Sequence, residues 1–235
     1  MPDFKPQPPV EVFDGVWNLT PGMSNSYLVV GSKEALLIDT GVGRDDFLEQ
    51  IAKITDKPVS LVTTHAHGDH TGGHKFFGTF HIGEKDIPFL DDSLKANAEA
   101  IDPARKFDFG GGDFAEFIPL PGHTPGSYGV LIRSRRLLFT GDMICNGTIF
   151  MVEGQCDFND FIASMDKISG FEGAVDYLVV CHGEPNALPV SHAAKQKAVA
   201  QAYLDGKLEA IVLPADGPRS GTVYANQDGL GFFRP

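Results

Sequence analysis

The segment at residues 64–73, THAHGDHTGG, constrains the fold of this chain more than any other part of its sequence. It directly follows the β-branched run at residues 59–63, which predicts a buried strand that ends in a loop of histidines. Because side chains alternate along an extended backbone, His65 and His67 lie on the same side of the chain. Two imidazoles in this arrangement can bind one metal ion, so the sequence predicts a metal site at the end of this strand.

A second pair of ligands follows in the same segment. The turn after Gly68 presents Asp69 and His70, a carboxylate and an imidazole, which can hold a second ion nearby. Nitrogen and oxygen ligands without thiolates suit Zn²⁺, Fe or Mn. Three histidines and one aspartate within six residues are improbable in an ordinary polar loop, although the segment alone does not fix the number of metals. His74, in contrast, is expected to pack in the interior or to contact a metal ligand, and not to bind a metal itself.

Three more candidate ligands lie further along the chain. His123 lies in a glycine- and proline-rich loop, and Asp142 and His182 each follow a predicted apolar strand. Taken singly, Asp142 could be a helix cap and His182 a hydrogen-bonded buried histidine. Together with the first segment they share one pattern, in which polar ligands lie at the ends of apolar strands. If none of these residues bound a metal, four separate motifs would have to show this pattern by coincidence.

The pattern of strands and helices predicts an α/β chain in two successive halves. The predicted strands cover residues 11–16, 26–30, 34–38, 59–63, 80–82, 115–120, 127–132, 136–140, 177–180 and 221–224. The predicted helices cover residues 47–54, 159–168 and 192–203. The first of these helices is expected to be capped by Asp45. The length of 235 residues suits one domain over residues 1–235. Residues 86–112, with two prolines and a run of three glycines, are expected to leave the core as an active-site flap.

Charge and composition exclude several classes of protein. The chain has 19 Lys+Arg against 31 Asp+Glu, a net charge of −12, so no nucleic-acid partner is expected. No run reaches the ~18 apolar residues that a membrane span needs, and residues 1–10 have no apolar run typical of a leader. Three cysteines do not suggest a disulfide framework, so a cytoplasmic location is expected.

The motifs THAHGDH, GHTPGS, TGD and CHG, in that order, resemble those of the metallo-β-lactamase superfamily over residues 12–183. The resemblance implies a four-layer αββα sandwich of two mixed β-sheets flanked by helices, with the metals at one edge between the sheets. It also implies the ligands: His65, His67 and His123 for one metal, Asp69, His70 and His182 for the second, and Asp142 bridging both.

The resemblance further implies a hydrolytic mechanism. Two dications roughly 3.5–4 Å apart hold a bridging hydroxide near neutral pH, which attacks a carbonyl carbon without any protein nucleophile. Asp142 holds both ions, and Asp69 or the second metal moves a proton or steadies the leaving group. Zinc is favoured over iron or manganese.

The bridging Asp142 is similar to that of the hydroxyacylglutathione hydrolase (glyoxalase II) and lactonase branch, whereas true β-lactamases of the superfamily usually lack it. About fifty residues follow His182, too few for the helical C-terminal domain that grips glutathione in glyoxalase II. The expected activity is therefore hydrolysis of an ester, thioester or lactone of a small molecule. Its pocket is expected to come from residues 86–112 and 145–158, and a homodimer is left open.

Two alternatives stand beside the dinuclear hydrolase. His65, His123 and Asp142 alone form a two-histidine, one-carboxylate set, which suits mononuclear Fe(II) and O₂. Persulfide dioxygenases of this superfamily use such a subset. The second alternative is a non-catalytic member that binds a ligand or partner, and the complete set of ligands argues against it.

Overall fold

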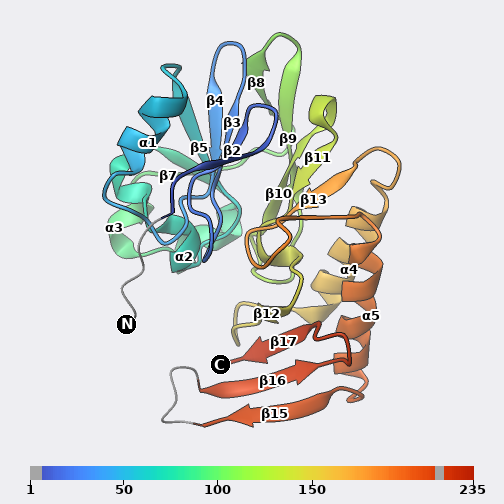
Figure 1. Cartoon of the computed structure of the whole chain (residues 1–235). Helices are drawn as coiled ribbons and strands as arrows, with labels where there is room; N and C mark the ends of the chain where they lie inside the picture. The colour runs from blue at the N-terminus through green and yellow to red at the C-terminus, as the bar shows by residue number, and fades with distance from the viewer. Residues whose placement is uncertain (1–6, 215–219) are drawn as a thin grey trace. The chain divides into compact units, whose positions relative to one another are not determined.

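The computed structural model describes residues 7–214 and 220–235, which cluster into two compact units (Figure 1). Unit 1 holds the residues up to Ile118 together with Val130–Arg135, and unit 2 holds Pro119–Gly129 and the residues from Arg136 onward. Residues 1–6, most of the N-terminal segment expected to carry no leader, lie outside the described residues. One domain over residues 1–235 stays a prediction.

Unit 1 is built on a seven-stranded sheet whose strand order, within the described residues, follows the chain. Its strands are β1 (Val10–Phe13), β2 (Val16–Asn18), β3 (Tyr27–Val30), β4 (Ala35–Ile38), β5 (Val59–Thr63), β6 (Phe80–Ile82) and β7 (Ala98–Ala100). β1 to β4 pair antiparallel, and β4 to β7 pair parallel. Parallel neighbours need a crossover, which helix α1 (Phe47–Ile54) supplies between β4 and β5.

The remaining elements of unit 1 are short. They are helices α2 (Gly68–Thr71) and α3 (Asp92–Lys95), the 3₁₀ turns η1 (His74–Phe76), η2 (Glu84–Phe89) and η3 (Arg133–Arg135), the antiparallel hairpin of β8 (Lys106–Gly110) and β9 (Asp113–Pro119), and the end of β10 (Tyr128–Ile132). The predicted strand at residues 11–16 is two strands, because Asp14 and Gly15 form a turn with a φ of 64° at the glycine.

Strand β4 lies at the centre of the core of unit 1. All four of its residues are buried, as expected for a strand covered on both faces. Its Leu37 belongs to the same apolar cluster as Phe47 and Ile51 of α1. The register pairs Ile38 of β4 with Val62 of β5, so these two parallel strands end together at one edge of the sheet. The candidate ligands of unit 1 follow directly after this edge.

The predicted cap of α1 is wrong. The residue at the N-cap is Asp46, not Asp45, and its side chain makes no capping hydrogen bond. The Asp46 carboxylate instead accepts hydrogen bonds from the Arg44 guanidinium at 2.5 and 2.9 Å and from the Gln50 amide at 2.6 Å. The hydrogen bond from Arg44 lowers the pKa of Asp46 to about 2. The Asp46 carboxylate is therefore bound to Arg44 and does not accept a hydrogen bond from the first backbone N–H groups of α1.

Residues 86–112 contribute regular structure. They contain the end of η2, helix α3, strand β7 at the edge of the seven-stranded sheet, and strand β8. Gly110, Gly111 and Gly112 all have positive φ and form the tight turn from β8 into β9. The segment therefore belongs to sheets of unit 1, and a role as a flap over the active site stays a prediction.

Unit 2 contains two groups of strands and two long helices. Strand β11 (Leu137–Phe139) pairs parallel with β13 (Tyr177–Val179), which pairs antiparallel with β14 (Ala187–Leu188). The 3₁₀ turn η4 (Gly141–Met143) follows β11, and the helices are α4 (Phe158–Ser169) and α5 (His192–Leu204). Helix α4 begins at Asp157, whose carboxylate accepts hydrogen bonds from the backbone N–H of Asn159 and Asp160.

The second group of strands in unit 2 is a four-stranded sheet that the sequence predicted only at residues 221–224. Its order is β12 (Thr148–Phe150), β17 (Gly231–Arg234), β16 (Gly221–Ala225) and β15 (Glu209–Leu213), and it lies beside α4 and α5 in Figure 1. Phe232 of β17 packs its ring against Phe158 and Phe161 of α4 and Tyr203 of α5, with centroid distances of 4.9, 5.6 and 5.9 Å. This aromatic cluster fixes one face of the sheet against the helices.

Two expectations from composition concern described residues. Cys145, Cys156 and Cys181 form no disulfide within the described residues, and burial raises the pKa of the Cys145 thiol to about 12. Over residues 7–214 and 220–235, the structure contains no helix with both the length and the apolar character that a bilayer crossing requires.

Gly122, which precedes the candidate ligand His123, is required by the packing of unit 2. Its φ is 138°, and a Cβ there would lie 2.3 Å from the Cα of Phe161 in α4. We expect Gly122→Ala to lower the free energy of unfolding by about 1–3 kcal/mol, because strain and a backbone clash add. Urea unfolding measures this change. The control is Gly147→Ala, where a Cβ meets no atom within 4 Å, and equal stability of the two variants would contradict the prediction.

Candidate metal centre

The first two predicted ligands lie in the loop that follows β5. His65 is buried, His67 is half-buried, and their rings meet edge to face with centroids 4.7 Å apart. His65 Nε2 and His67 Nδ1 are 3.1 Å apart. Two nitrogens bound to one tetrahedral zinc at about 2.0–2.1 Å would be about 3.3 Å apart, so this pair fits a shared ion. The alternation predicted from the sequence thus places both rings together.

The next two ligands lie on the short helix α2, which begins after His67. His70 is buried, and its ring centroid lies 4.0 Å from that of His65. His70 Nε2 is 3.7 Å from an oxygen of Asp69, whose side chain is 41% exposed. The predicted set of four is therefore assembled within unit 1, with one carboxylate open to solvent.

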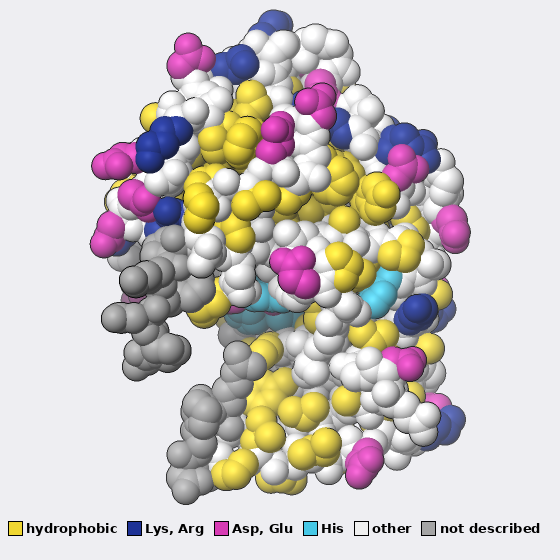
Figure 2. All heavy atoms as spheres, viewed as in Figure 1, with side chains coloured by type: hydrophobic (Ala, Val, Ile, Leu, Met, Phe, Trp, Pro, Cys, Tyr) yellow, Lys and Arg dark blue, Asp and Glu magenta, His cyan; other side chains and the backbone are white. Residues whose placement is uncertain are grey.

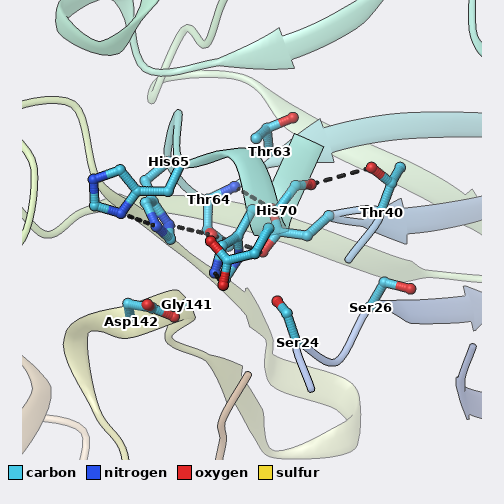
Figure 3. Close-up of polar contacts among 12 residues, drawn as sticks. Ser24, Ser26, Thr40, Thr63, Thr64, His65, His70, Gly141 and Asp142 are labelled. Carbon is cyan, nitrogen blue, oxygen red and sulfur yellow. Dashed lines mark hydrogen bonds and ion pairs between the residues drawn. The ribbon is translucent and has the colours of Figure 1, made fainter. Parts of the chain in front are cut away.

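Asp39, which the sequence analysis did not single out, orients two residues of this set. It follows β4, is fully buried, and accepts hydrogen bonds from the Thr64 N–H and Thr64 hydroxyl, each at 2.7 Å. Its second oxygen lies 2.9 Å from His70 Nδ1. A carboxylate at Nδ1 fixes the ring orientation, with Nε2 on the side of Asp69. Figure 3 shows Thr64 and His70 on the segment after β5.

His74 supports the same segment from behind, in line with the sequence analysis. Its Nδ1 lies 2.8 Å from the Thr40 hydroxyl, and its Nε2 lies 2.6 Å from the Thr63 hydroxyl. The Thr40 hydroxyl donates to the carbonyl oxygen of His70 at 3.2 Å (Figure 3), so His74 Nδ1 donates to Thr40 and Nε2 accepts from Thr63. This is the pattern of a neutral imidazole, and burial lowers the pKa of His74 to about 4.

A second buried carboxylate, Asp86 of η2, holds the backbone between the first two histidines. Its Oδ2 accepts a hydrogen bond from the N–H of Ala66 at 2.9 Å, and the residue is fully buried. The sequence analysis missed Asp86, because a single aspartate at the start of residues 86–112 carries no local signal.

Unit 2 brings together the other three predicted ligands. Asp142 lies in η4 after β11, and His182 follows β13; these strands are parallel neighbours, so both residues emerge at one edge. Asp142 Oδ2 is 3.7 Å from His123 Nε2, and Asp142 Oδ1 is 3.3 Å from His182 Nε2. The two oxygens of one carboxylate therefore each face a different histidine. Asp142 can therefore offer one oxygen beside each histidine.

All seven predicted ligands are among the histidines and carboxylates of the described residues that could hold a metal. They form two sets, four in unit 1 and three in unit 2. Imidazole and carboxylate donors fit zinc, iron or manganese, so the chemistry of both sets agrees with the metals expected.

Comparison with known proteins gives a family match over the same region. The family model described as "Metallo-beta-lactamase superfamily" matches residues 19–195, which include all seven predicted ligands. Hydroxyacylglutathione hydrolase GloC of Haemophilus influenzae is 33% identical over 146 residues, 54% of this chain and 66% of that protein. Lactamase-like protein adaB of Aspergillus niger is 28% identical over 163 residues, 66% of this chain and 48% of that protein. The chain spans less than two thirds of the length of either relative.

Solved structures agree on the fold. A metallo-beta-lactamase from Pontibacter korlensis matches with a TM-score of 0.67 at 20% identity, covering 82% of this chain and 98% of that chain. The predicted fold class, the αββα metallo-β-lactamase fold with mixed sheets and helices, is confirmed by this similarity.

The contact between Asp39 and His70 generates a prediction about metal binding. We expect Asp39→Asn to weaken zinc affinity about 10–100-fold, because an amide no longer fixes the tautomer of His70. Competition with a chromophoric chelator measures the affinity. Asp91→Asn is the control, since Asp91 is an exposed carboxylate that only caps α3. Unchanged affinity in Asp39→Asn would contradict the role assigned to Asp39.

The neutral state of His74 generates a prediction about pH. Its pKa is about 4 in the folded chain against 6.5 in the unfolded chain, so the unfolded state binds more protons between these values. The free energy of unfolding should therefore fall as the pH is lowered from 6.5 through 4, by about 3 kcal/mol from this residue. His74→Gln, which does not titrate, should lose this part of the slope.

Urea unfolding at several pH values, with a chelator present, measures the slope of each variant. His81→Gln is the control, because the His81 side chain is 44% exposed and the change should leave the slope as in the wild type. Equal slopes for wild type and His74→Gln would show that His74 is not held neutral.

Proposed function

Because this chain belongs to the metallo-beta-lactamase superfamily, we propose that it is a dinuclear metal-dependent hydrolase of an ester, thioester or lactone. The observation that carries the proposal is the geometry of Asp142 in unit 2. Its two oxygens face His123 and His182 separately, at 3.7 and 3.3 Å. A carboxylate presented in this way suits two ions better than one.

We assign the ligands as the sequence motifs imply. One ion would be held by His65, His67 and His123 and the second by Asp69, His70 and His182, and Asp142 would be a ligand of both. The close approach of the His65 and His67 nitrogens supports the first set, and the approach of His70 Nε2 to Asp69 supports the second. Zinc is the metal we propose, because neutral imidazoles and carboxylates are its usual ligands in catalytic sites.

The reaction depends both on the metal ions and on residues beside them. Metal ions at such a site supply Lewis-acid polarisation of a carbonyl and lower the pKa of water toward neutrality. We assign to Asp69, or to the second metal, the role of moving a proton or steadying the leaving group, and the partly exposed side chain of Asp69 supports this role. Gly68 next to it leaves open space, since a Cβ there would meet no atom within 4 Å, and a substrate can approach from this side.

The relatives guide the choice of substrate. One relative is named a hydroxyacylglutathione hydrolase, a name that describes cleavage of an acyl thioester. We therefore propose a small molecule with an activated carbonyl as the substrate, and neither a nucleic acid nor a membrane as a partner. We propose the reducing cytoplasm as its location, because three cysteines in the sequence do not suggest a disulfide framework.

Metal content and hydrolysis together test the proposal. We expect about two zinc ions per chain by elemental analysis, and turnover of a thioester, an aryl ester or a lactone. Asp142→Ala should lower turnover about 10³-fold, because coordination of the metals contributes several kcal/mol to the reaction. The same change should also lower the metal content. The control is Asp166→Ala, because Asp166 is an exposed carboxylate of unit 2 that pairs with Lys197. This change should alter neither turnover nor metal content.

Three outcomes would contradict the proposal. One iron per chain with O₂ uptake on a persulfide substrate would identify the dioxygenase alternative. Metal binding without turnover of any carbonyl substrate would favour a non-catalytic member. Full activity in Asp142→Ala would show that Asp142 does not bridge the metals.

A further inference from the structure

Strand β15 forms the edge of the four-stranded sheet in unit 2. It pairs with β16 on one side, in continuous register from Glu209 opposite Ala225 to Leu213 opposite Gly221. On its other side, no strand of the described residues pairs with it. An edge of this kind presents a row of backbone donors and acceptors to any strand that can align with it.

The other sheet edges of the described residues are short, charged or irregular, and two of them, β12 with three residues and β14 with two, are protected by their length alone. Strand β1 has Glu11 in the strand and an irregular register between Glu11 and Phe13. Strand β7 is three residues long with Glu99 at its centre. Strand β8 carries Lys106 and Asp108 and is irregular before its end. Charges, bulges and shortness are the usual ways in which proteins keep edge strands from pairing.

Strand β15 has none of these protections over its last four residues. Its sequence is EAIVL, so the only charge lies at the first position, and its register with β16 has no irregularity. The side chains are also exposed: Ile211 is 54% and Val212 is 76% accessible. Figure 2 shows hydrophobic side chains gathered over this sheet. The strand is therefore an apolar edge that is open to another strand.

The two exposed side chains point to opposite faces of the sheet. The register places Ile211 in a row with Val223 and Phe233, whereas Val212 lies in a row with Thr222 and Arg234. A helix laid on one face would cover only one of the two exposed side chains. A further strand added to the edge would contact both, because its own side chains alternate in the same way.

We propose that this edge is the contact between two copies of the chain, joined by antiparallel pairing of β15 with β15 about a two-fold axis at Ile211. In this register Ile211 lies opposite Ile211 of the second copy, Ala210 opposite Val212, and Glu209 opposite Leu213. Apolar side chains then meet on both faces, and the single carboxylate of each strand meets no other charge. The two four-stranded sheets become one continuous sheet.

The sequence of β15 favours a second copy as the occupant. The strand is self-complementary when antiparallel, and a two-fold contact uses one patch on both subunits. A parallel arrangement would bring Glu209 beside Glu209, where like charges repel. With a net charge of −12 on each chain, a contact between copies needs a region almost free of charge, and β15 provides one. This inference does not rest on the proposed enzymatic activity.

Sedimentation velocity of the full chain, at about 0.15 M salt where surface repulsion is screened beyond ~8 Å, tests the proposal. The wild type should sediment as twice the 25.3 kDa chain at micromolar concentrations. Val212→Lys should raise the dimer dissociation constant at least tenfold, since an edge lysine blocks strand pairing. Leu204→Lys, which changes a 45% exposed side chain on α5, is the control and should remain dimeric. Circular dichroism and thermal unfolding confirm that both variants fold.

Oxidative cross-linking tests the register. Ile211→Cys should form a covalent dimer, because the two cysteines would face each other across the axis, whereas Val212→Cys, opposite Ala210, should cross-link far less. The wild type, with its own three cysteines, gives the background. A monomeric wild type at every concentration, equal dimerisation of Val212→Lys and Leu204→Lys, or preferential cross-linking of Val212→Cys would overturn the proposal.

Discussion

One buried carboxylate, that of Asp39, holds the ligand segment of unit 1 in position. It is fully buried, and burying a charge is costly unless donors surround it. The donors are the N–H and hydroxyl of Thr64 and the ring of His70, which all belong to the segment after β5. Because β4 and β5 are parallel and end together, Asp39 reaches this segment at the edge of the sheet. The orientation of His70 thus depends on the pairing of two apolar strands.

Unit 2 uses the same principle with different residues. Parallel pairing of β11 with β13 brings Asp142 and His182 out at one edge, as β4 and β5 do in unit 1. The loop that carries His123 is instead fixed by close backbone packing of Gly122 against α4, where no side chain fits. In both units the apolar strands determine where the polar groups lie.

A feature of this fold can be predicted from the sequence where it has a local pattern, and it is missed where it depends on residues far away along the chain. The histidine segment and the apolar strands carry a period or spacing that can be recognised without a structure. Asp39 and Asp86 have no such signal, since their importance comes from donors that lie 20 or more residues away along the chain. The cap at Asp45 failed because Arg44 takes the adjacent carboxylate. Strand β15 at residues 209–213 was missed because an apolar run of only four residues after Glu209 becomes a strand through its neighbour β16.

The groups that surround the ligands of unit 1 also favour a bound cation. Asp39 and Asp86 place two carboxylates in the interior, each accepting hydrogen bonds from the ligand segment. His74, a nearby histidine that is not a predicted ligand, has its pKa lowered to about 4 by burial and so adds no positive charge at neutral pH. A protonated imidazole at this position would repel a dication, whereas a neutral one only orders the threonines beside it. The electrostatics of the supporting residues and the identity of the ligands therefore point to the same occupant.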